Sequence, residues 1–216
     1  MRSAGLWRVR MPCVSGRASL MRRLVPRPSQ KRGTVSAKHQ LRIALLRQLR
    51  TQKEEQRRRK SQAVIRKLLR LAVFRKAKTV LCYVSLSYEV ETRRLLERML
   101  AQGKRVVVPR VQGRKLFLSA IRDPDSDLAP GAFGVLEPAS EAMPPVPLRQ
   151  LDLVVVPGLA FYHRGHRLGH GFGYFDGLLT RLPKRIPSIG LCFDFQLLEH
   201  LPTHTHDRPV QAVICA

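Results

Sequence analysis

Apolar residues recur at helical spacing in several stretches of the chain, and four segments are predicted to be helices. The clearest stripe is Leu41, Leu45 and Leu49, and Ser36 is placed to act as the N-cap of that helix. The predicted helices span residues 36–50, 54–71, 92–102 and 173–182. The second of them has an almost wholly charged first half, so its apolar stripe lies toward its end.

Runs of mostly apolar residues, without polar alternation, predict strands that are buried on both faces. These runs span residues 79–86, 105–109, 115–121, 152–157, 188–193 and 210–215. Residues 123–149, rich in Pro, Asp and Gly, are expected to form a loop. Strands alternating with helices predict a single α/β domain with three α/β/α layers and a mainly parallel, Rossmann-like sheet. Ligands are expected beyond the carboxyl ends of the strands, near residues 85–91, 158–176 and the segment from Phe193 onward.

The charge of the chain is strongly basic. Of 216 residues, 40 are Lys or Arg and 15 are Asp or Glu, which gives a net charge of +25. Residues 1–35 hold nine basic residues and no acid, so we interpret them as a basic, disordered extension. Residues 36–216 are then the folded domain. An organellar transit peptide and an upstream start codon are the alternative interpretations of the extension.

A basic balance favours anionic partners, so a nucleic-acid-binding protein is a competing hypothesis. Its contacts would be the extension and residues 57–60, which read Arg-Arg-Arg-Lys. Aromatic residues do not interleave with these basic runs, so recognition by base stacking lacks support. No apolar run approaches the ~18 residues that a membrane span needs, and we expect no membrane partner.

Metal-ligating side chains are scattered through the chain. The four cysteines are widely scattered: Cys13, Cys82, Cys192 and Cys215. No pair has metal-ligand spacing, and a disulfide framework is not expected in a chain of this size, so we expect a reducing compartment, the cytoplasm. His200, His204 and His206 are close in sequence, but Pro202 keeps them from sharing one helix face. They are expected to be loop histidines, with a zinc site as the second interpretation.

The most informative stretch is residues 167–176, which read Arg-Leu-Gly-His-Gly-Phe-Gly-Tyr-Phe-Asp after an apolar strand. Its three glycines let backbone N–H groups approach an anion, and a helix beginning near Gly173 directs its positive end at the same point. Arg167 adds a fork of donors, and Asp176 is placed to hold a hydrated Mg²⁺ against a phosphate. The stretch predicts a nucleotide-phosphate site, although many glycine-rich turns between a strand and a helix bind nothing.

Residues 156–161 and 165–176 resemble the signature of the 5-formyltetrahydrofolate cyclo-ligase family, also called methenyltetrahydrofolate synthetases. Six further segments resemble the family in the same order: residues 38–42, 83–92, 107–110, 131–138, 189–196 and 206–210. The resemblance implies the family's NagB/RpiA/CoA-transferase-like α/β fold. It also implies closure of 5-formyltetrahydrofolate to 5,10-methenyltetrahydrofolate with MgATP, through phosphorylation of the formyl oxygen and release of ADP and phosphate.

The resemblance further implies roles for individual residues. ATP is expected to contact the first helix and the glycine-rich stretch through Lys38, Arg42, Arg167, Leu168, Gly169, His170, Gly171, Phe172, Gly173, Tyr174 and Phe175. The folate substrate is expected to contact Val84, Glu89, His170, Gly171, Phe172, Gly173 and Tyr174. Asp176 and Asp207 are the expected Mg²⁺ ligands, and Arg167 and Asp176 the expected catalytic pair.

Structural interpretations compete with several of these roles. Lys38 and Arg42 can be solvated charges on an amphipathic helix, and Glu89 can be a helix-capping acid. Val84 can belong to the core of a strand, and Tyr174 can pack a helix onto the sheet.

Three residues depart from the family's pattern. Tyr162 stands where the family often has aspartate, Phe175 where it usually has tyrosine, and Gln211 where an aspartate is common. None of them removes the glycines or the two metal-site acids. We therefore expect an active, monomeric enzyme, and the alternative is a divergent relative that binds folate or nucleotide without turnover.

Overall fold

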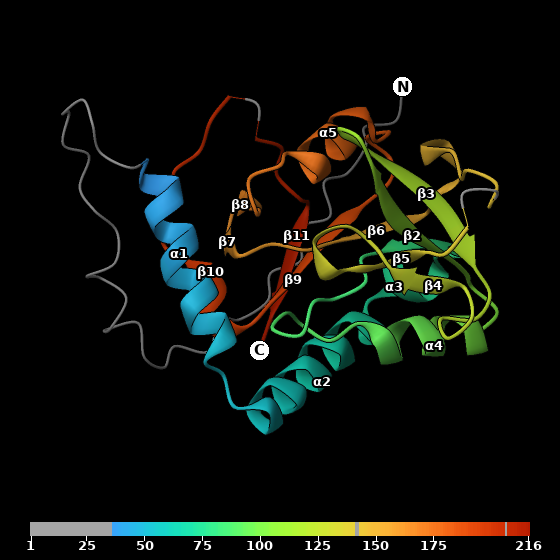
Figure 1. Ribbon diagram of the computed structural model, residues 1–216, viewed down its shortest axis with the longest axis horizontal. Coiled ribbons are helices and arrows are strands. Elements are labelled where there is room, and N and C mark those ends of the chain that lie inside the picture. Colours follow the sequence, from blue (N-terminus) through green and yellow to red (C-terminus); the bar gives the residue numbers. More distant parts are fainter. Residues whose placement is uncertain (1–35, 141–142, 206) are drawn as a thin grey trace.

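The computed structural model describes residues 36–140, 143–205 and 207–216, and the predicted basic extension, residues 1–35, lies outside it. Its centre is a six-stranded sheet with the order β11-β9-β6-β1-β2-β3 (Figure 1). The strands of this sheet are β1 (Thr79–Cys82), β2 (Arg105–Gln112), β3 (Lys115–Ile121), β6 (Leu153–Val156), β9 (Ser188–Cys192) and β11 (Ala212–Cys215). All neighbours in it pair in parallel except β3, which pairs antiparallel with β2 at one edge. The prediction of a mainly parallel sheet is confirmed.

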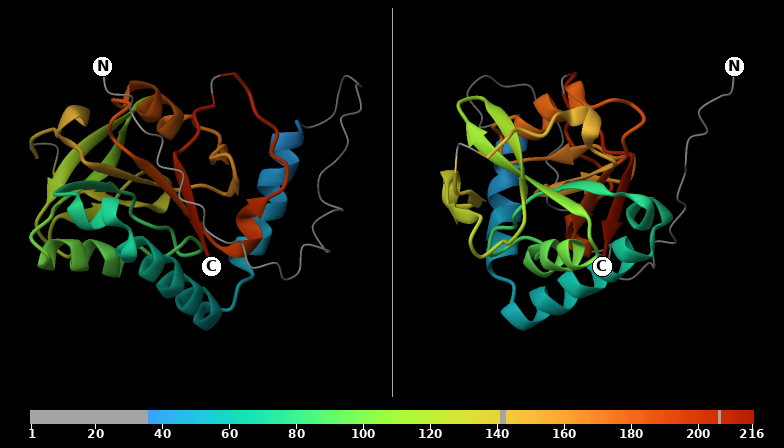
Figure 2. Two further views of the ribbon diagram at one scale, coloured as in Figure 1. Left: turned by 180° about the vertical axis from the view of Figure 1, so that it is seen from behind. Right: turned by 90° about the vertical axis from the view of Figure 1, so that its right-hand side faces the viewer.

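Helices cover both faces of this sheet. They are α1 (Ala37–Arg50), α2 (Glu54–Arg70), α3 (Ala72–Lys76), α4 (Arg93–Ala101) and α5 (Tyr174–Arg181). In Figure 1, α2, α3 and α4 lie on one side of the sheet and α5 on the other, and Figure 2 shows the same layers from two further directions. Helix α1 stands beside these layers, next to β7 (Ala160–Tyr162) and β10 (Leu197–Leu198). The predicted three-layer α/β architecture is therefore confirmed. None of the described helices is long and apolar enough to cross a membrane.

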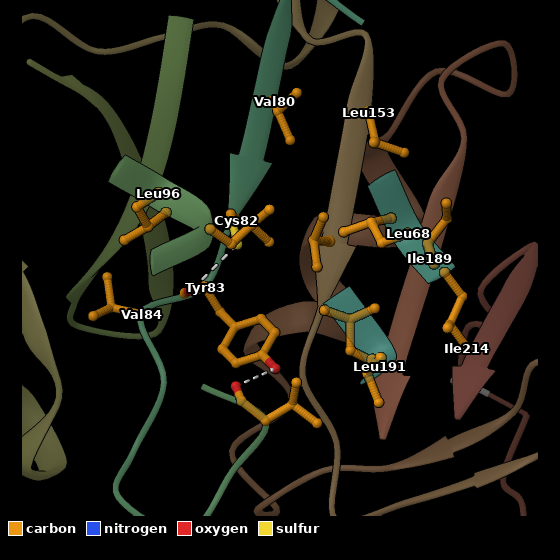
Figure 3. Close-up of a cluster of buried hydrophobic side chains, with 14 of the residues drawn as sticks. Leu68, Val80, Cys82, Tyr83, Val84, Leu96, Leu153, Ile189, Leu191 and Ile214 are labelled. Carbon is orange, nitrogen blue, oxygen red and sulfur yellow. Dashed lines mark hydrogen bonds between the residues drawn. The ribbon is translucent and has the colours of Figure 1, made fainter. Parts of the chain in front are cut away.

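Successive residues of each strand enter different apolar layers, which explains why the strand sequences show no polar alternation. The layer under α2 and α4 is drawn in Figure 3, where it includes Leu68, Val80, Cys82, Leu96, Leu153, Ile189, Leu191 and Ile214. Leu81, between Val80 and Cys82, belongs to the opposite layer together with Leu178 of α5. The inner strands β6 and β9 are thus buried on both faces, whereas β3, at the edge of the sheet, is partly exposed.

The prediction of a loop over residues 123–149 is wrong in part. This segment contains a short antiparallel pair, β4 (Leu128–Pro130) and β5 (Leu136–Pro138), joined by the 3-10 turn η2 (Ala132–Gly134). A further 3-10 turn, η3, spans Leu148–Gln150. Strands of three residues that end in proline are too short to show a periodic pattern, and for the same reason β7, β8 (Arg167–Leu168) and β10 were not predicted.

The ends of two predicted elements also differ. Ser36 occupies the N-cap position, but it accepts bonds from the N–H groups of His39 and Gln40 through its carbonyl oxygen, and its side chain makes no capping bond. The strand predicted over residues 79–86 ends at Cys82, since β2 and β6 pair with β1 only up to that residue. The four residues that follow leave the sheet and turn toward the site.

Candidate active site

A cavity of about 450 Å³ opens where β1 and β6 end, at the carboxyl edge of the sheet. Helix α1, the segment after β1, the β4–β5 pair, the glycine-rich stretch and the loop before β11 all contribute to its wall. Every residue that the sequence predicted to contact a ligand lies along it: Lys38, Arg42, Val84, Glu89, all of 167–176, and Asp207. The predicted residues come from four segments that are distant in sequence, namely α1, the segment after β1, the glycine-rich stretch and the loop before β11. The fold therefore gathers these four segments around one cavity.

Lys38, in the first turn of α1, is not a solvated charge. Its Nζ lies 2.6 Å from Oδ2 of Asp207, and the two side chains are 9% and 11% exposed. Burial raises the pKa of the Asp207 carboxyl, but the hydrogen bonds from Lys38 and the His204 N–H, with the Lys38 charge, hold it below its ordinary 3.8. Asp207 is therefore a carboxylate held in place at neutral pH.

Arg42 holds the glycine-rich stretch from the same helix, one turn further along. Its Nε donates a hydrogen bond of 2.9 Å to the carbonyl oxygen of Gly169. The guanidinium also lies against Gly171, where a Cβ would approach the Arg42 Cζ to 3.4 Å. Gly171 has a φ of +110°, a conformation that other residues rarely adopt, so glycine is needed here for its backbone conformation.

Arg167 and Asp176, the two ends of the glycine-rich stretch, meet across it. Arg167 Nη2 lies 3.1 Å from Asp176 Oδ1, and Nη1 donates to the carbonyl oxygen of Arg208 at 2.7 Å. Burial lowers the pKa of the Arg167 guanidinium below its ordinary value, and the charges of Asp176 and Asp207 oppose that shift. The stretch is thus closed into a loop whose ends carry opposite charges.

Asp176 and Asp207 are suited to a magnesium ion. The N–H of Arg208, the residue after Asp207, donates to Asp176 Oδ1 at 3.1 Å, so both carboxylates stand at the same end of the cavity. Within residues 36–140, 143–205 and 207–216, no group of three or more His, Cys, Asp or Glu could enclose a metal ion. Magnesium in phosphate sites is commonly held by one or two carboxylates plus phosphate oxygens and water, which this pair of acids fits.

The zinc interpretation of the late histidines gains no support from the described residues. His204 lies in a loop along the cavity and donates its backbone N–H to Asp207 at 2.7 Å. His200 is exposed and is not part of the cavity wall, and His206 lies outside the described residues. The loop placement expected for His200 and His204 is what the structure has.

The segment after β1 is held out of the sheet by reciprocal hydrogen bonds between Ser85 and Thr92. Each backbone N–H donates to the other residue's hydroxyl oxygen, at 3.0 and 3.1 Å. The hydroxyl of Thr92 also donates to the carbonyl oxygen of Tyr83. The hydroxyl of Tyr83 in turn donates to the carbonyl oxygen of Val90 (Figure 3). These bonds form a closed turn that presents residues 86–89 to the cavity.

Glu89 projects from this turn and is 7% exposed. Its Oε2 accepts the N–H of Leu86 at 3.0 Å, and its Oε1 lies 3.4 Å from Nε2 of His170 in the glycine loop. Thr92, not Glu89, occupies the N-cap position of α4, so the helix-capping interpretation of Glu89 is wrong. Val84 is both a core residue and part of the cavity wall, which agrees with both of its interpretations.

Sequence reasoning missed part of the wall. Phe133, in the β4–β5 turn, is 58% exposed and lies 4.4 Å from Phe172 between ring centroids, and Tyr174 stands 5.8 Å from Phe172. Tyr88 and Glu137 also line the cavity and were not nominated. The signal for these residues was present, because residues 83–92 and 131–138 were singled out as similar to a family without any role being attached to Tyr88, Phe133 or Glu137.

Two of the three departures lie away from the cavity wall. Tyr162 closes the turn before β8 with backbone bonds to Gly165 and His166, and Gln211 binds the backbone N–H of Ser188 at 2.6 Å. Only Phe175 lines the cavity. The segment from Phe193 onward was predicted to reach the site. Its Gln196 stabilises the loop after β6, because the Gln196 Nε2 donates hydrogen bonds to the carbonyl oxygens of Gly158 and Leu159.

The fold and the site together define an α/β protein with a glycine loop, paired cations and carboxylates around one ligand cavity. A sequence profile of the 5-formyltetrahydrofolate cyclo-ligase family matches residues 34–216, and the chain belongs to this family. Membership confirms the resemblance that the motifs indicated, and with it a ligase of folate one-carbon metabolism.

Individual relatives agree with the profile. The 5-formyltetrahydrofolate cyclo-ligase of Haemophilus influenzae is 33% identical over 69% of this chain and 81% of its own. The Mus musculus enzyme of the same name is 29% identical over 83% of this chain and 93% of its own. The NMR structure of Aquifex aeolicus 5,10-methenyltetrahydrofolate synthetase has a TM-score of 0.74 and 35% identity, over 83% of this chain and 90% of that one. A Mycoplasma pneumoniae synthetase, with a TM-score of 0.66 and 21% identity over 82% of this chain and 97% of that one, supports the fold alone.

Proposed function

We propose that this protein converts 5-formyltetrahydrofolate to 5,10-methenyltetrahydrofolate, consuming ATP in the presence of Mg²⁺ and releasing ADP and phosphate. The observation that carries the proposal is the single cavity that gathers the glycine loop, Lys38, Arg42, Glu89 and Asp207. The family to which the chain belongs and the names of its relatives support the same reaction.

In this proposal ATP lies between α1 and the glycine loop. Lys38 and Arg42 face the phosphates from the helix, and residues 167–175 surround them with backbone N–H groups and the Arg167 guanidinium. Supporting this placement, Lys38 and Arg167 both line the cavity, and each is held within 3.1 Å of a carboxylate that lines it too. A polyphosphate with a divalent cation presents both signs of charge and is complementary to these four groups.

Asp176 and Asp207 are the proposed magnesium ligands. Magnesium neutralises charge on the transferred phosphoryl group when it is bound, and the two acids position it. In the described residues, Oδ2 of Asp176 has no hydrogen-bond partner, which leaves this oxygen for a ligand while Oδ1 is held by Arg208 and Arg167.

The folate is proposed to lie beside the nucleotide, with its pterin ring near Glu89, Val84 and residues 170–174. A buried carboxylate such as Glu89 needs N–H donors, and the edge of a pterin ring supplies them. The short distance between Glu89 and His170 supports one continuous site, because it joins the proposed folate wall to the glycine loop.

The reaction is balanced without a covalent enzyme intermediate. The formyl oxygen attacks the terminal phosphorus of ATP, so a new P–O bond forms as the bond to ADP breaks. N10 then bonds to the formyl carbon and gives up its proton, the carbon–oxygen bond breaks, and phosphate leaves with the former formyl oxygen. Positioning and charge neutralisation are the main contributions that such phosphoryl transfer asks of a protein.

Oligomeric state and compartment complete the proposal. We propose that the protein acts as a monomer, a state that agrees with a cavity wall built from segments of one chain. Cys82 and Cys192 are fully buried in strands, which suits a reducing compartment such as the cytoplasm.

The test is the near-ultraviolet absorbance of the purified chain with 5-formyltetrahydrofolate. We expect the band of the methenyl product to grow only when ATP and Mg²⁺ are both present. Reactions lacking ATP, lacking Mg²⁺ or lacking protein are the controls. Folded protein that binds ATP but yields no band would replace this proposal with a binder that does not turn over.

A further inference from the structure

Glu137 in β5 is a second buried carboxylate in the cavity wall, and none of the roles above uses it. It is 7% exposed and lines the same cavity as Glu89. Its Oε1 accepts one hydrogen bond, from the backbone N–H of Val111 in β2 at 3.2 Å. In the described part of the chain it forms no salt bridge, and its Oε2 accepts no hydrogen bond. A buried carboxylate with one neutral donor is costly unless a further donor reaches it.

The chain makes room for this carboxylate at one particular residue. Gly131, at the end of β4, lies directly against the Glu137 side chain, and a Cβ there would stand 2.6 Å from Cγ, Cδ and Oε2. The backbone of Gly131, with φ −122°, is one that any residue can adopt. Glycine is therefore needed at this position for the space that it leaves to Glu137, not for its backbone conformation.

The cations of the cavity are engaged elsewhere. Lys38 pairs with Asp207, Arg42 with the carbonyl oxygen of Gly169, and Arg167 with Asp176. All three belong to α1 and β8, whereas Glu137 belongs to β5, which pairs with β4, contacts β2 and lies away from α1 in Figure 1. The part of the wall around Glu137 is apolar and aromatic: Pro109, Val111, Leu116, Phe133 and Val135.

We propose that Glu137 is a specificity-determining residue that accepts hydrogen bonds from N–H groups of the folate substrate. The inference rests on the proposed function. It gives the folate a second acidic contact in addition to Glu89. An anionic phosphate chain is repelled by this carboxylate, while a flat heteroaromatic or aromatic amide group with N–H donors matches both the apolar wall and the charge.

The first test removes the negative charge of Glu137 and keeps the shape of its side chain. Glu137→Gln retains an oxygen for the Val111 N–H, so the β2–β5 contact is preserved. We expect the KM for 5-formyltetrahydrofolate to rise by about tenfold or more, since the charge-assisted bond is lost. The KM for ATP should stay within about twofold. Glu97→Gln, on the exposed surface of α4, removes the same charge outside the cavity and is the matched control.

A second variant reaches the carboxylate without changing it. Gly131→Ala places a methyl group where Glu137 now lies, so it should raise the KM for folate in the same direction. Combined with Glu137→Gln, its effect should be less than the product of the two single effects, because both variants act on one contact. Calorimetric titration of each protein with 5-formyltetrahydrofolate alone measures the same loss as a weaker affinity, independently of turnover.

The outcomes separate this inference from the function on which it rests. An active wild-type chain with an unchanged folate KM in both variants overturns the role of Glu137 alone. A rise in the KM for ATP, with folate unaffected, also overturns it and moves Glu137 to the nucleotide. A wild-type chain without turnover refutes the proposed function, and the calorimetric titration then decides about Glu137: equal or absent folate binding in wild type and variants overturns its role.

Discussion

Lys38 and Asp207 are 169 residues apart in the chain, and their side chains meet at 2.6 Å at one end of the cavity. The contact joins the first turn of α1 to the loop before β11. It also places a cation and a carboxylate side by side. The Arg167–Asp176 pair lies close to them, because the N–H of Arg208, the residue after Asp207, donates to Asp176. In the proposed reaction these two pairs form the end of the cavity where phosphate and metal ion are held.

Replacing Lys38 should therefore weaken the binding of ATP more than that of folate. Lys38→Met removes a buried charge that faces the proposed phosphate position, and we expect the KM for ATP to rise at least about tenfold. Lys53→Met, on the exposed segment between α1 and α2, is the control for loss of a lysine charge. Steady-state kinetics with each substrate varied in turn measure the effect, and an unchanged KM for ATP would contradict the placement of the nucleotide.

The lowered pKa of Asp207 makes part of the stability depend on pH. In the folded state the carboxyl has a pKa below 3.8, so its contribution is complete above about pH 4 to 5 and is lost as the pH falls through the folded-state value. We expect Asp207→Asn to lower the free energy of unfolding by about 2 kcal/mol near neutral pH. As the pH falls through the folded-state pKa of Asp207, which lies below 3.8, the difference between wild type and variant should shrink. Urea unfolding of both proteins across this range tests it, and a difference that stays constant at every pH would argue against the ion pair.

How far the sequence predicts this structure depends on the range of the interactions. The glycine loop and the apolar strands are local patterns, and both were predictable. The burial of Lys38 was not, because it depends on Asp207 at the far end of the chain, and on its own helix Lys38 looks like one more surface charge. The same holds for the end of β1, which is decided by hydrogen bonds between Ser85 and Thr92 rather than by any change in apolar pattern.

The missed wall residues follow the same rule. Phe133 and Glu137 lie on a hairpin whose strands are three residues long, so no period announces them. Their position in the cavity comes from the pairing of β4 with β5 and from the contact of Glu137 with Val111 in β2. Only the three-dimensional arrangement places them beside the glycine loop.

Glu89 and Asp176 should fail in different ways when each charge is removed. Glu89→Gln is expected to raise the KM for 5-formyltetrahydrofolate, since a buried acceptor for the pterin is weakened. Asp176→Asn is expected to lower kcat by about a hundredfold and to raise the Mg²⁺ concentration required, since a metal ligand and the partner of Arg167 are lost. Rates measured over a Mg²⁺ titration distinguish the two, with the exposed Asp125→Asn as the control. Near wild-type kinetics for both variants would refute the assignment of the site.

The last prediction concerns the basic extension, residues 1–35. Removing it tests whether these basic residues are needed for folate turnover or only for binding an anionic partner. Every residue given a role lies after residue 35, and the family profile begins at residue 34. A chain that starts at Ser36 keeps every residue given a role, so its kcat and both KM values should stay within about twofold of the full chain.

If the extension contacts nucleic acid, the full chain should bind single-stranded DNA or RNA with an affinity that falls steeply between about 50 and 200 mM salt, and the shortened chain should lose that binding. Retained binding that disappears on neutralising residues 57–59 in the exposed half of α2 would instead place the contact on that helix. Loss of folate turnover on shortening would show that the domain begins earlier than Ser36, and thermal unfolding of both chains would then show whether folding or the site alone was affected.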